Sequence, residues 1–308
     1  MSVIGFDTSN YTTSVACYNG TDGENCSKLL PVREGGLGLR QSEAVFHHTQ
    51  SLPELSGRLF SHIEAADITA VGVSTRPRAV EGSYMPCFLV GYSHAKMLSD
   101  LLGVPLFLCS HQQGHVAAAL WSAGRLDLMD TPHLAWHLSG GTTELLLVEP
   151  EGKNVKCTKI GGTTDISAGQ LIDRTGQMLG LQFPAGKQLD QLSRAAKTEE
   201  FFRVKCQETT FSFSGVQNKV QQYHETHGAE DTAYYAIRSI GETVLKISRN
   251  AQKLYPGLEI VFSGGVASNS MLRDLTAPLC PVFAEPAFST DNAMGVAVLT
   301  SRAQEIKP

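Results

Sequence analysis

The 308-residue sequence lacks any long apolar run. A membrane-spanning helix needs about 18 or more consecutive apolar residues, and no such stretch occurs here. The chain also lacks an apolar signal segment near its start, because a short buried strand there reaches Asp7 almost at once. We therefore expect a cytoplasmic protein that has no membrane as a partner.

Paired cysteines are missing as well. The seven cysteines are scattered, and no two of them have the Cys-x-x-Cys spacing of zinc and redox sites. An odd number without paired spacing argues against a disulfide framework. We expect reduced thiols that are mostly buried.

An excess of positive charge is the third absence. The chain has 25 Lys and Arg against 30 Asp and Glu, a net charge of −5. This balance excludes binding of nucleic acid by charge alone, so such a substrate would need a local basic patch or a partner subunit. With 42% hydrophobic and 18% charged residues, the chain is long enough for two domains with a large buried core.

Among the residues that are present, two histidines lie at the start of a predicted helix. Val104–Cys109 reads as a strand, and the apolar run Val116–Leu120 belongs to the helix that follows it. His111 and His115 are four residues apart, so both imidazoles face one side, where they can hold one divalent metal. Two ordinary surface or capping histidines are the alternative. Gln112 stands where a zinc protease needs a glutamate base, which excludes that activity.

A polar turn follows a buried strand near the start of the chain. Val3–Phe6 reads as the strand, and Val15–Tyr18 as its returning partner. The turn between them is rich in hydroxyls and contains Asp7 and Ser9, which suit contact with phosphate or with a metal phosphate. A polar turn without a ligand is the alternative.

A second hairpin repeats this plan a domain's length away. Leu134–Leu138 and Leu145–Val148 read as strands. The polar turn between them consists of Ser139, Gly140, Gly141, Thr142, Thr143 and Glu144. Internal repetition of this kind indicates two related domains, each with a phosphate-binding hairpin.

A third glycine turn follows the strand Leu258–Phe262. Gly264 and Gly265 come directly after a serine, and Asn269 precedes a short helix. Glycine lets the backbone approach a ligand closely, and the start of a helix favours an anion. In the actin-like ATPases, two hairpins and a third glycine turn of this kind surround a bound nucleotide.

Two aspartates lie at predicted helix positions. We expect Asp165 to cap a helix that ends near Gly180 and carries Asp173 late in its course. An acid there opposes the helix dipole, so Asp173 is a candidate for binding ribose hydroxyls, with a surface aspartate as the alternative. Asp291 opens the last helix, and on its own it reads as an N-cap.

Taken together, the motifs resemble the tRNA threonylcarbamoyladenosine synthase family, formerly called O-sialoglycoprotein endopeptidases or glycoproteases. The resemblance covers nearly the whole chain. It includes residues 5–9, 48–55, 91–98, 111–115, 139–145, 173–186, 211–215, 264–269 and 290–292. It implies an α/β fold of two actin-like domains, the ASKHA or ribonuclease H-like class. We place the N-terminal domain at 1–130, together with a C-terminal helix at about 290–308, and the second domain at 131–289.

The resemblance also implies an activity. Members transfer a threonylcarbamoyl group from threonylcarbamoyl-AMP to the exocyclic amine of the adenosine beside the tRNA anticodon, and AMP leaves. The implied ligands of one divalent metal, Fe²⁺ or Zn²⁺, are His111, His115 and Asp291. Together with the three turns, it predicts contacts to the substrate or to a nucleotide (threonylcarbamoyl-AMP, AMP, ADP or ATP) at Asp7, Ser9, Ser139, Gly140, Gly141, Thr142, Asp173, Gly186, Gly264, Gly265 and Asn269. The implied partners are tRNA and the partner proteins of the pathway.

Four departures from the family pattern indicate a diverged paralogue. Thr142 replaces a histidine, Ile166 and Ser167 replace paired acids, and Ala185 replaces a glycine. The longer segment 76–86 stands where the family has Gly-Pro-Gly-Leu. The alternatives are therefore a non-catalytic subunit that binds nucleotide and metal and pairs with a paralogous subunit, or carbamoyl transfer to another acceptor. An actin-like kinase needs an acidic base and Mg²⁺ but no histidine pair, so the histidines argue against it.

Overall fold

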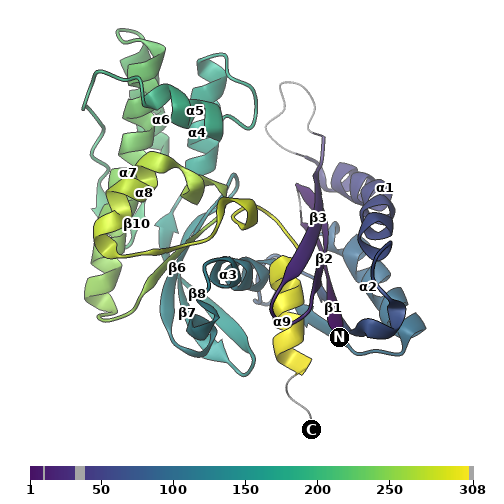
Figure 1. The fold of residues 1–308 in the computed structure, drawn as a ribbon. Helices are drawn as coiled ribbons and strands as arrows, with labels where there is room; N and C mark the ends of the chain where they lie inside the picture. Colours follow the sequence, from purple (N-terminus) through teal and green to yellow (C-terminus); the bar gives the residue numbers. More distant parts are fainter. Residues whose placement is uncertain (10, 32–38, 305–308) are drawn as a thin grey trace. The chain divides into compact units, whose positions relative to one another are not determined.

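The computed structural model of the chain describes residues 1–9, 11–31 and 39–304 and divides into two compact units (Figure 1). The first unit comprises Met1–Thr131, Glu149–Cys157 and Asp291–Pro308, and the second comprises Pro132–Val148 and Thr158–Thr290. Residue 10 of the first predicted turn and residues 305–308 of the predicted last helix lie outside the described residues.

The first unit is built on a five-stranded sheet in the order β3-β2-β1-β4-β5. The strands are β1 (Ser2–Ser9), β2 (Thr12–Tyr18), β3 (Gly23–Leu29), β4 (Ile68–Ser74) and β5 (Leu106–Cys109). β1 pairs antiparallel with β2 and parallel with β4, which in turn pairs parallel with β5. The main helices are α1 (Gln41–Phe60), α2 (Phe88–Leu102), α3 (His111–Ser122) and α9 (Met294–Gln304), with the 3₁₀ turns η1 (Ala65–Asp67) and η2 (Leu126–Asp130).

Alternation along the strands sends side chains to the two faces of this sheet. Ile4 and Phe6 of β1 pack with Leu52 and Leu55 of α1 in one hydrophobic cluster. Gly5, between them on β1, faces α9 instead, because an added Cβ would lie 2.6 Å from the amide nitrogen of Ala297. The sheet therefore has α1 on one face and α9 on the other.

Glycine allows α9 to pack closely against its neighbours in the first unit. A Cβ on Gly72 of β4 would overlap the hydroxyl of Thr300, and a Cβ on Gly295 would overlap the carbonyl oxygen of Gly114 in α3. Side chains at these positions would push the elements apart. The close approach of α9 to α3 brings Asp291, just before α9, to the start of α3.

The second unit contains most of a seven-stranded sheet in the order β12-β11-β6-β7-β8-β10-β9. The strands are β6 (His133–Leu138), β7 (Thr143–Glu151), β8 (Asn154–Thr163), β9 (Cys206–Gln207), β10 (Thr210–Phe211), β11 (Ile260–Ser263) and β12 (Val282–Phe283). The helices are α4 (Ala168–Met178), α5 (Gly186–Ser193), α6 (Ser214–His224), α7 (Ala229–Leu254) and α8 (Ser270–Thr276), with η3 (Gly265–Ser268), η4 (Ala277–Leu279) and η5 (Pro286–Phe288). Trp136 of β6 is fully buried in the core and donates a 2.8 Å hydrogen bond to Ser248 of α7.

The tip of the β7–β8 hairpin belongs to the first unit, whereas the sequence placed all of 131–289 in the second domain. Two side chains of the first unit hold this tip. Gln113 of α3 donates a 2.7 Å hydrogen bond to the carbonyl of Val155, and Arg302 of α9 donates one to the carbonyl of Lys153. These long-range bonds have no signature in the local sequence.

Two local expectations are corrected. The first predicted turn is much shorter than expected, because Asp7 pairs with Ser14 and Ser9 with Thr12 inside the β1–β2 ladder. The cap of α4 is Ser167, whose hydroxyl accepts from the amide of Gln170, and not Asp165. Asp165 instead accepts hydrogen bonds from the segment 212–214.

Asp173 and the last helix also differ from expectation. Asp173 lies in the middle of α4 rather than late in it, so the argument from the helix dipole does not apply to it. α9 begins at Met294 rather than at about residue 290, and Asn292, not Asp291, accepts from the amide of Met294. Among the residues described, no helix is long and apolar enough to cross a membrane.

Candidate metal and nucleotide sites

The two histidines lie on the first turn and a half of α3, which follows β5 directly. The cap of this helix is Ser110, whose hydroxyl accepts from the amide of Gln113 while the Gln113 side chain accepts from the amide of Ser110. This capping box fixes where α3 begins. His111 is therefore its first residue, and His115 lies one turn further on the same face.

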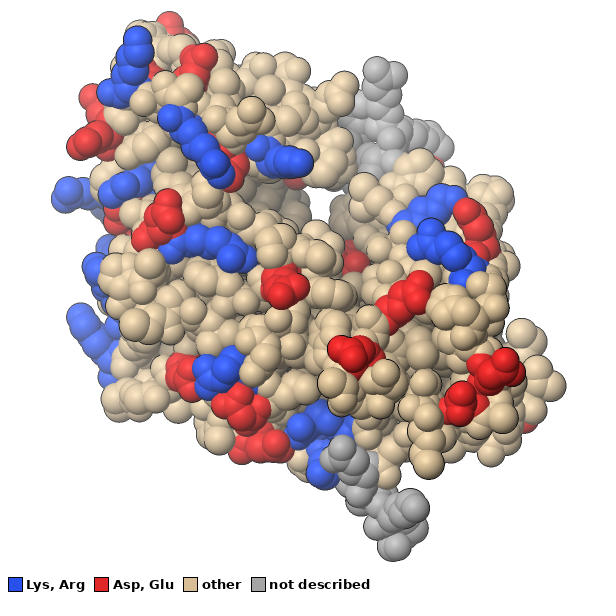
Figure 2. Space-filling view, viewed as in Figure 1, with Lys and Arg blue, Asp and Glu red and all other residues tan. Residues whose placement is uncertain are grey.

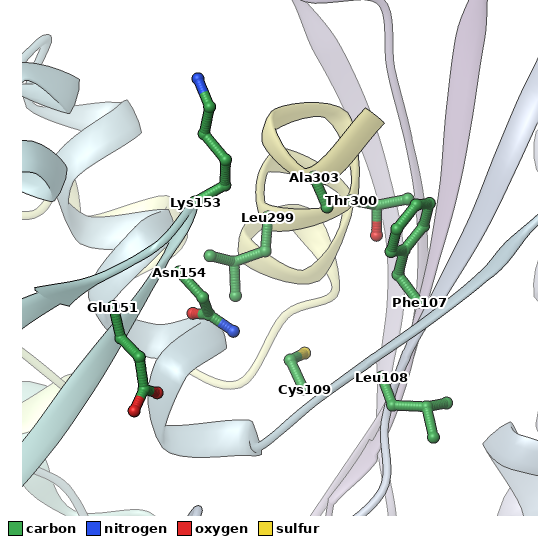
Figure 3. A pocket seen from close by; sticks show the side chains of 9 residues that line it. All are labelled: Phe107, Leu108, Cys109, Glu151, Lys153, Asn154, Leu299, Thr300 and Ala303. Atoms are coloured by element: carbon green, nitrogen blue, oxygen red, sulfur yellow. The ribbon is translucent and has the colours of Figure 1, made fainter. Parts of the chain in front are cut away.

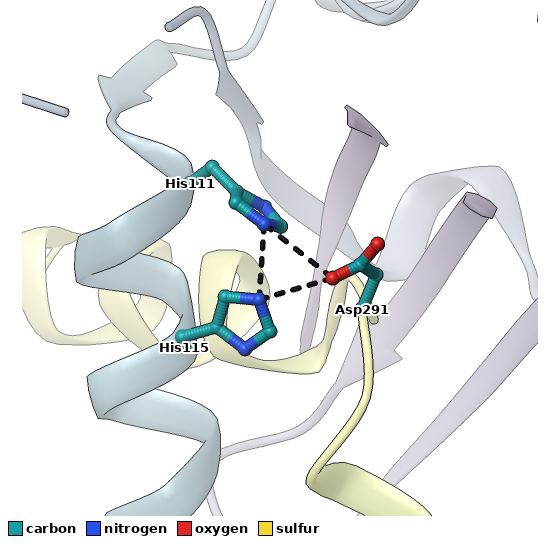
Figure 4. A group of neighbouring side chains, drawn as sticks. All are labelled: His111, His115 and Asp291. Carbon is teal, nitrogen blue, oxygen red and sulfur yellow. Dashed lines mark hydrogen bonds and ion pairs between the residues drawn. The ribbon is translucent and has the colours of Figure 1, made fainter. Parts of the chain in front are cut away.

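Asp291 completes a triangle of possible metal ligands with the two histidines (Figure 4). The Nε2 atoms of His111 and His115 are 2.9 Å apart, and Oδ1 of Asp291 lies 3.2 Å from the second and 3.5 Å from the first. Ligands that bind one cation at about 2.0–2.1 Å lie about 2.9–3.4 Å from one another. Two of the three separations lie in this range and the third, at 3.5 Å, is just above it, so the three side chains fit a single divalent ion with further positions open.

The electrostatics of this triangle favour a cation. Burial by itself would lower the pKa of His111, but the carboxylates of Asp7 and Asp291 outweigh it and raise that pKa to about 10. Burial would raise the pKa of Asp291, but His111 and His115 hold it well below its ordinary value. A metal that binds here must therefore displace a proton, as metal ligands generally require.

Asp7 points at the first histidine. Its Oδ2 lies 2.9 Å from Nδ1 of His111, and its Oδ1 accepts a hydrogen bond from the hydroxyl of Ser74. The side chain is fully buried. Ser9, two residues along the same strand face, has a buried hydroxyl without a hydrogen-bond partner among the described residues, so it can serve a ligand.

The segment after β4 supports the start of α3. The amides of His111 and Gln112 donate 2.9 Å and 3.0 Å hydrogen bonds to the carbonyls of Arg76 and Pro77. The third amide, that of Gln113, donates to the hydroxyl of Ser110, so the N-terminal end of α3 is fully capped. The segment that departs most from the family pattern therefore rests directly on the helix that carries the histidines.

Sequence reasoning missed Ser74 and the carbonyls of Arg76 and Pro77. A signal for Ser74 existed, because it ends a strand parallel to β1, and the ends of neighbouring parallel strands meet at one edge of a sheet. The carbonyl contacts could not be read from the sequence, since any residue supplies that group.

In the second unit, the turn after β6 is closed by its own hydrogen bonds. The amide of Ser139 donates to the carbonyl of Thr142, and the amide of Thr142 donates to the hydroxyl of Ser139. Gly140 and Gly141 are exposed, and an added Cβ on either would meet nothing within 4 Å. A ligand can therefore approach the backbone of these two glycines closely.

The third glycine turn lies beside this one. Gly264 has a φ of 91°, and an added Cβ would overlap the carbonyl of Leu138, the last residue of β6. The structure therefore brings the turn that contains Gly264 and Gly265 next to the Ser139–Thr142 turn. Asn269 caps α8 by accepting a 3.0 Å hydrogen bond from the amide of Leu272.

Asp173 and Gly186 form another group in the second unit. Oδ1 of Asp173 accepts a 2.9 Å hydrogen bond from the amide of Ala185, which precedes Gly186 at the start of α5. Burial raises the pKa of Asp173, partly offset by this bond. The carboxylate therefore holds the turn that leads into α5.

A small cavity lies elsewhere in the first unit (Figure 3). Its volume is about 170 Å³, and its lining residues are Phe107, Leu108, Cys109, Glu151, Lys153, Asn154, Leu299, Thr300 and Ala303. Burial, together with the charge of Asp7, raises the pKa of the Cys109 thiol. A protonated thiol is a poor nucleophile, so this cavity does not read as a catalytic site.

The fold defines the class of this chain. It is similar to the structure of full-length HypF in its phosphate- and nucleotide-bound form, with a TM-score of 0.63 and 13% identity over 99% of this chain and 46% of that one. It is also similar to the ROK hexokinase from Thermus thermophilus, with a TM-score of 0.53 and 14% identity over the whole of both chains. These likenesses, together with the two sheets of the structure, confirm the predicted actin-like α/β fold.

Residues 33–298 match the tRNA N6-adenosine threonylcarbamoyltransferase family. The Thermosipho africanus protein of that name is 31% identical over 97% of this chain and 93% of its own length. A relative of the same name from Streptococcus equi subsp. zooepidemicus is 34% identical over 70% of this chain, which matches 64% of that relative's length. The chain belongs to this family, as predicted, and the relatives it matches are named as transferases.

Proposed function

We propose that this protein transfers the threonylcarbamoyl group of threonylcarbamoyl-AMP to the exocyclic amine of the anticodon-adjacent adenosine of tRNA. In this reaction the amine nitrogen bonds to the carbamoyl carbon, the bond from that carbon to the phosphate oxygen breaks, and AMP leaves. The observation that carries the proposal is the His111, His115 and Asp291 triangle in a member of this family.

The residues of the first unit fit a divalent ion, Fe²⁺ or Zn²⁺, because two imidazole nitrogens and one carboxylate oxygen are suitable ligands for both. When bound, such an ion supplies a Lewis acid that polarises the carbonyl of the transferred group. Asp7 keeps His111 in place, and the hydroxyl of Ser9, which has no hydrogen-bond partner among the described residues, can donate to a substrate oxygen.

In the second unit, the exposed backbone of Gly140 and Gly141 suits contact with the phosphate of the nucleotide. Gly264 and Gly265 flank this turn, since the φ of Gly264 lets its backbone lie against the end of β6. Asp173 accepts a hydrogen bond from the amide of Ala185 and so holds the turn at Gly186. We therefore include Asp173 and Gly186 among the proposed nucleotide contacts, with Asp173 acting through the backbone of this turn. The backbone amide of Thr142 closes the first of these turns, and the Asn269 side chain caps α8 directly after the other, so both belong to the proposed contacts.

Binding of tRNA by this chain alone is not favoured by its charge. On the face shown in Figure 2, Lys and Arg side chains are interspersed with Asp and Glu, in keeping with the net charge of −5. Phosphate contacts need an accumulation of positive charge. We therefore propose that partner proteins of the pathway, or a paralogous subunit, supply part of the tRNA-binding surface.

The test is reconstitution. Purified protein loaded with Fe²⁺ or Zn²⁺ is incubated with threonylcarbamoyl-AMP, tRNA and the candidate partner proteins, and the tRNA is digested and analysed by mass spectrometry. We expect threonylcarbamoyladenosine with the wild-type protein and none with His115→Ala. Absence of the modified nucleoside with every partner combination would contradict the proposal.

A second candidate is a subunit that binds nucleotide and metal without catalysing transfer. The observation that favours it is the use of Ser167 as a structural cap, where the family has paired acids. The Ser167 hydroxyl donates a 2.6 Å hydrogen bond to the carbonyl of Gly140 and accepts from the amide of Gln170. Metal and AMP binding by a protein that forms no product with tRNA or with a free amine acceptor would support this candidate. Product with the free amine alone would instead indicate another acceptor.

A further inference from the structure

We infer that Asp7 and Ser74 are a positioning pair that fixes which nitrogen of His111 faces the proposed metal. The inference rests on the metal site of the proposed function and deepens it. It assigns Asp7 to the support of a metal ligand, whereas the sequence suggested contact with phosphate.

The register of the sheet places the two residues together. β1 and β4 are parallel neighbours, with Gly5 opposite Gly72 and Phe6 opposite Val73, so the next step along both strands brings Asp7 beside Ser74. Both side chains are fully buried, and the Ser74 hydroxyl donates to Oδ1 of Asp7. The bond holds the carboxylate in one orientation, with its other oxygen directed at α3.

That second oxygen determines the state of His111. A carboxylate can only accept hydrogen bonds, so Nδ1 of His111, 2.9 Å away, must carry the hydrogen. In a neutral imidazole the other nitrogen, Nε2, then keeps its lone pair. Nε2 is the atom that faces His115 and Asp291, at 2.9 Å and 3.5 Å. The pair thus selects the tautomer that can bind a metal at the centre of the triangle.

The carboxylate also orients the ring and makes Nε2 a stronger donor to a metal, as supporting carboxylates behind metal-bound histidines do. Ser74 acts one step further away, because it holds Asp7 rather than His111. Both residues are therefore positioning residues, and neither touches the substrate. Removing such a partner typically weakens metal binding about 10- to 100-fold.

The experiment measures metal affinity on the whole 308-residue chain. Zn²⁺ and Co²⁺ are titrated against a competing chelator for the wild type, Asp7→Ala, Asp7→Asn and Ser74→Ala, and the visible absorption of the Co²⁺ forms reports the ligand geometry. The matched control is Ser14→Ala. Ser14 is also fully buried, but its hydroxyl donates to the backbone carbonyl of Asp7 at 3.3 Å and not to the carboxylate.

We expect Asp7→Ala to bind about 10- to 100-fold more weakly, with an altered Co²⁺ spectrum. Asp7→Asn should lose less, since its amide oxygen can still accept from Nδ1 of His111. Ser74→Ala should show a smaller loss in the same direction. Ser14→Ala should bind the metal as tightly as the wild type does, although it also removes a buried hydroxyl that contacts Asp7.

Three results would overturn the inference. The first is wild-type affinity in Asp7→Ala, or, if that variant does not fold, equal affinities of Ser74→Ala and Ser14→Ala. The second is a loss in Asp7→Ala as complete as that in His115→Ala, which would make Asp7 a direct ligand. The third is a wild type that binds no metal, which also removes the metal site of the proposed function, whereas the first two leave that site intact.

Discussion

The buried His48 and the partly buried His111 lie on opposite faces of the same β1–β2 hairpin. His48 comes from α1, and its Nδ1 lies 2.8 Å from the hydroxyl of Thr13 on β2. His111 comes from α3, and its Nδ1 lies 2.9 Å from the carboxylate of Asp7 on β1. Successive residues of a strand point to opposite faces, which is why one ladder serves both histidines with different partners.

The pKa values of the two histidines move in opposite directions. Burial lowers the pKa of His48 to about 4, and the charges of Asp7 and Asp291 offset this only in part. Burial would also lower that of His111, but direct contact with the same two carboxylates raises it to about 10. The comparison shows that burial alone does not decide whether a histidine is neutral or charged. A hydroxyl partner leaves a structural, neutral imidazole, and two carboxylates create a site for a cation.

The largest expected effect comes from removing a ligand. In structural zinc sites a binding free energy of about 10–16 kcal/mol is shared among a few ligands. On that scale, the loss of one ligand of three should weaken binding on the order of a thousandfold. We expect this of His115→Ala and of Asp291→Ala in chelator-competition titrations. His48→Gln is the control on the other face of the hairpin, and it should keep its metal affinity. Equal metal affinities for His115→Ala and His48→Gln would remove the distinction between the two faces.

The next effect comes from moving Asp291 without changing it. A Cβ on Gly295 would overlap backbone atoms of α3, whereas a Cβ on Gly114 would lie 3.4 Å from a methyl group of Val296 and 3.8 Å from its backbone nitrogen, which are ordinary van der Waals contacts. Gly295→Ala should therefore separate α9 from α3 and cost about 3 kcal/mol, and metal affinity should fall as Asp291 shifts. Gly114→Ala should be neutral or slightly stabilising, because alanine favours a helix by about 1 kcal/mol over glycine.

Denaturant unfolding and metal titration of both glycine variants check this prediction. Both variants add one methyl group where α9 crosses α3. Comparing them therefore separates the effect of the close backbone approach at Gly295 from the general effect of a larger side chain. A Gly295→Ala protein as stable and as tightly metal-binding as Gly114→Ala would show that this approach does not position Asp291.

These glycines also show what the sequence could and could not predict. The spacing of His111 and His115 sufficed to put both on one face of a helix, because that depends on helix geometry alone. Asp291 is 176 residues from His115, and only the family resemblance suggested that the two meet. Their approach depends on the packing of Gly295 on Gly114, which no local pattern encodes.

The corrections have the same physical origin. Asp165 followed a local capping rule, but its carboxylate is occupied by the segment 212–214, so Ser167 caps α4 instead. Asp7 was expected in a turn, but strand pairing extends through it and directs it to His111 and Ser74. The repeated hairpin turns and the family resemblance predicted the actin-like α/β fold, whereas side-chain partners set by distant residues required the structure.

A pH experiment tests the neutral state of His48. Its pKa is about 4 in the folded protein and about 6.5 when unfolded, so the unfolded chain takes up the proton more readily. The stability due to this residue is complete above the unfolded value and is lost as the pH falls from about 6.5 towards 4. The free energy of unfolding of the wild type should therefore fall relative to that of His48→Gln by on the order of 2 kcal/mol between pH 7 and pH 5.

Unfolding in denaturant with a chelator present, at a series of pH values, measures this difference. His111 has the opposite sign, since its raised pKa contributes stability that is complete below about pH 6.5 and is lost as the pH rises from there through about 10. Both proteins contain His111, so its contribution cancels. A difference in stability that does not change with pH would mean that the pKa of His48 is the same in the folded and the unfolded chain, and the contrast between the two faces would disappear.

The smallest expected effect concerns the hydroxyl that partners His48. Thr13→Val keeps the shape of the side chain but leaves Nδ1 of His48 buried without its 2.8 Å hydrogen bond, which should cost about 1–2 kcal/mol of unfolding free energy. Thr13→Ser keeps the hydroxyl and should recover most of that loss. Metal affinity should be unchanged in both, because Thr13 faces α1 and not α3. A change in metal affinity without a change in stability would show that the two faces of the hairpin are coupled, and that His48 belongs to the metal site rather than only to the core.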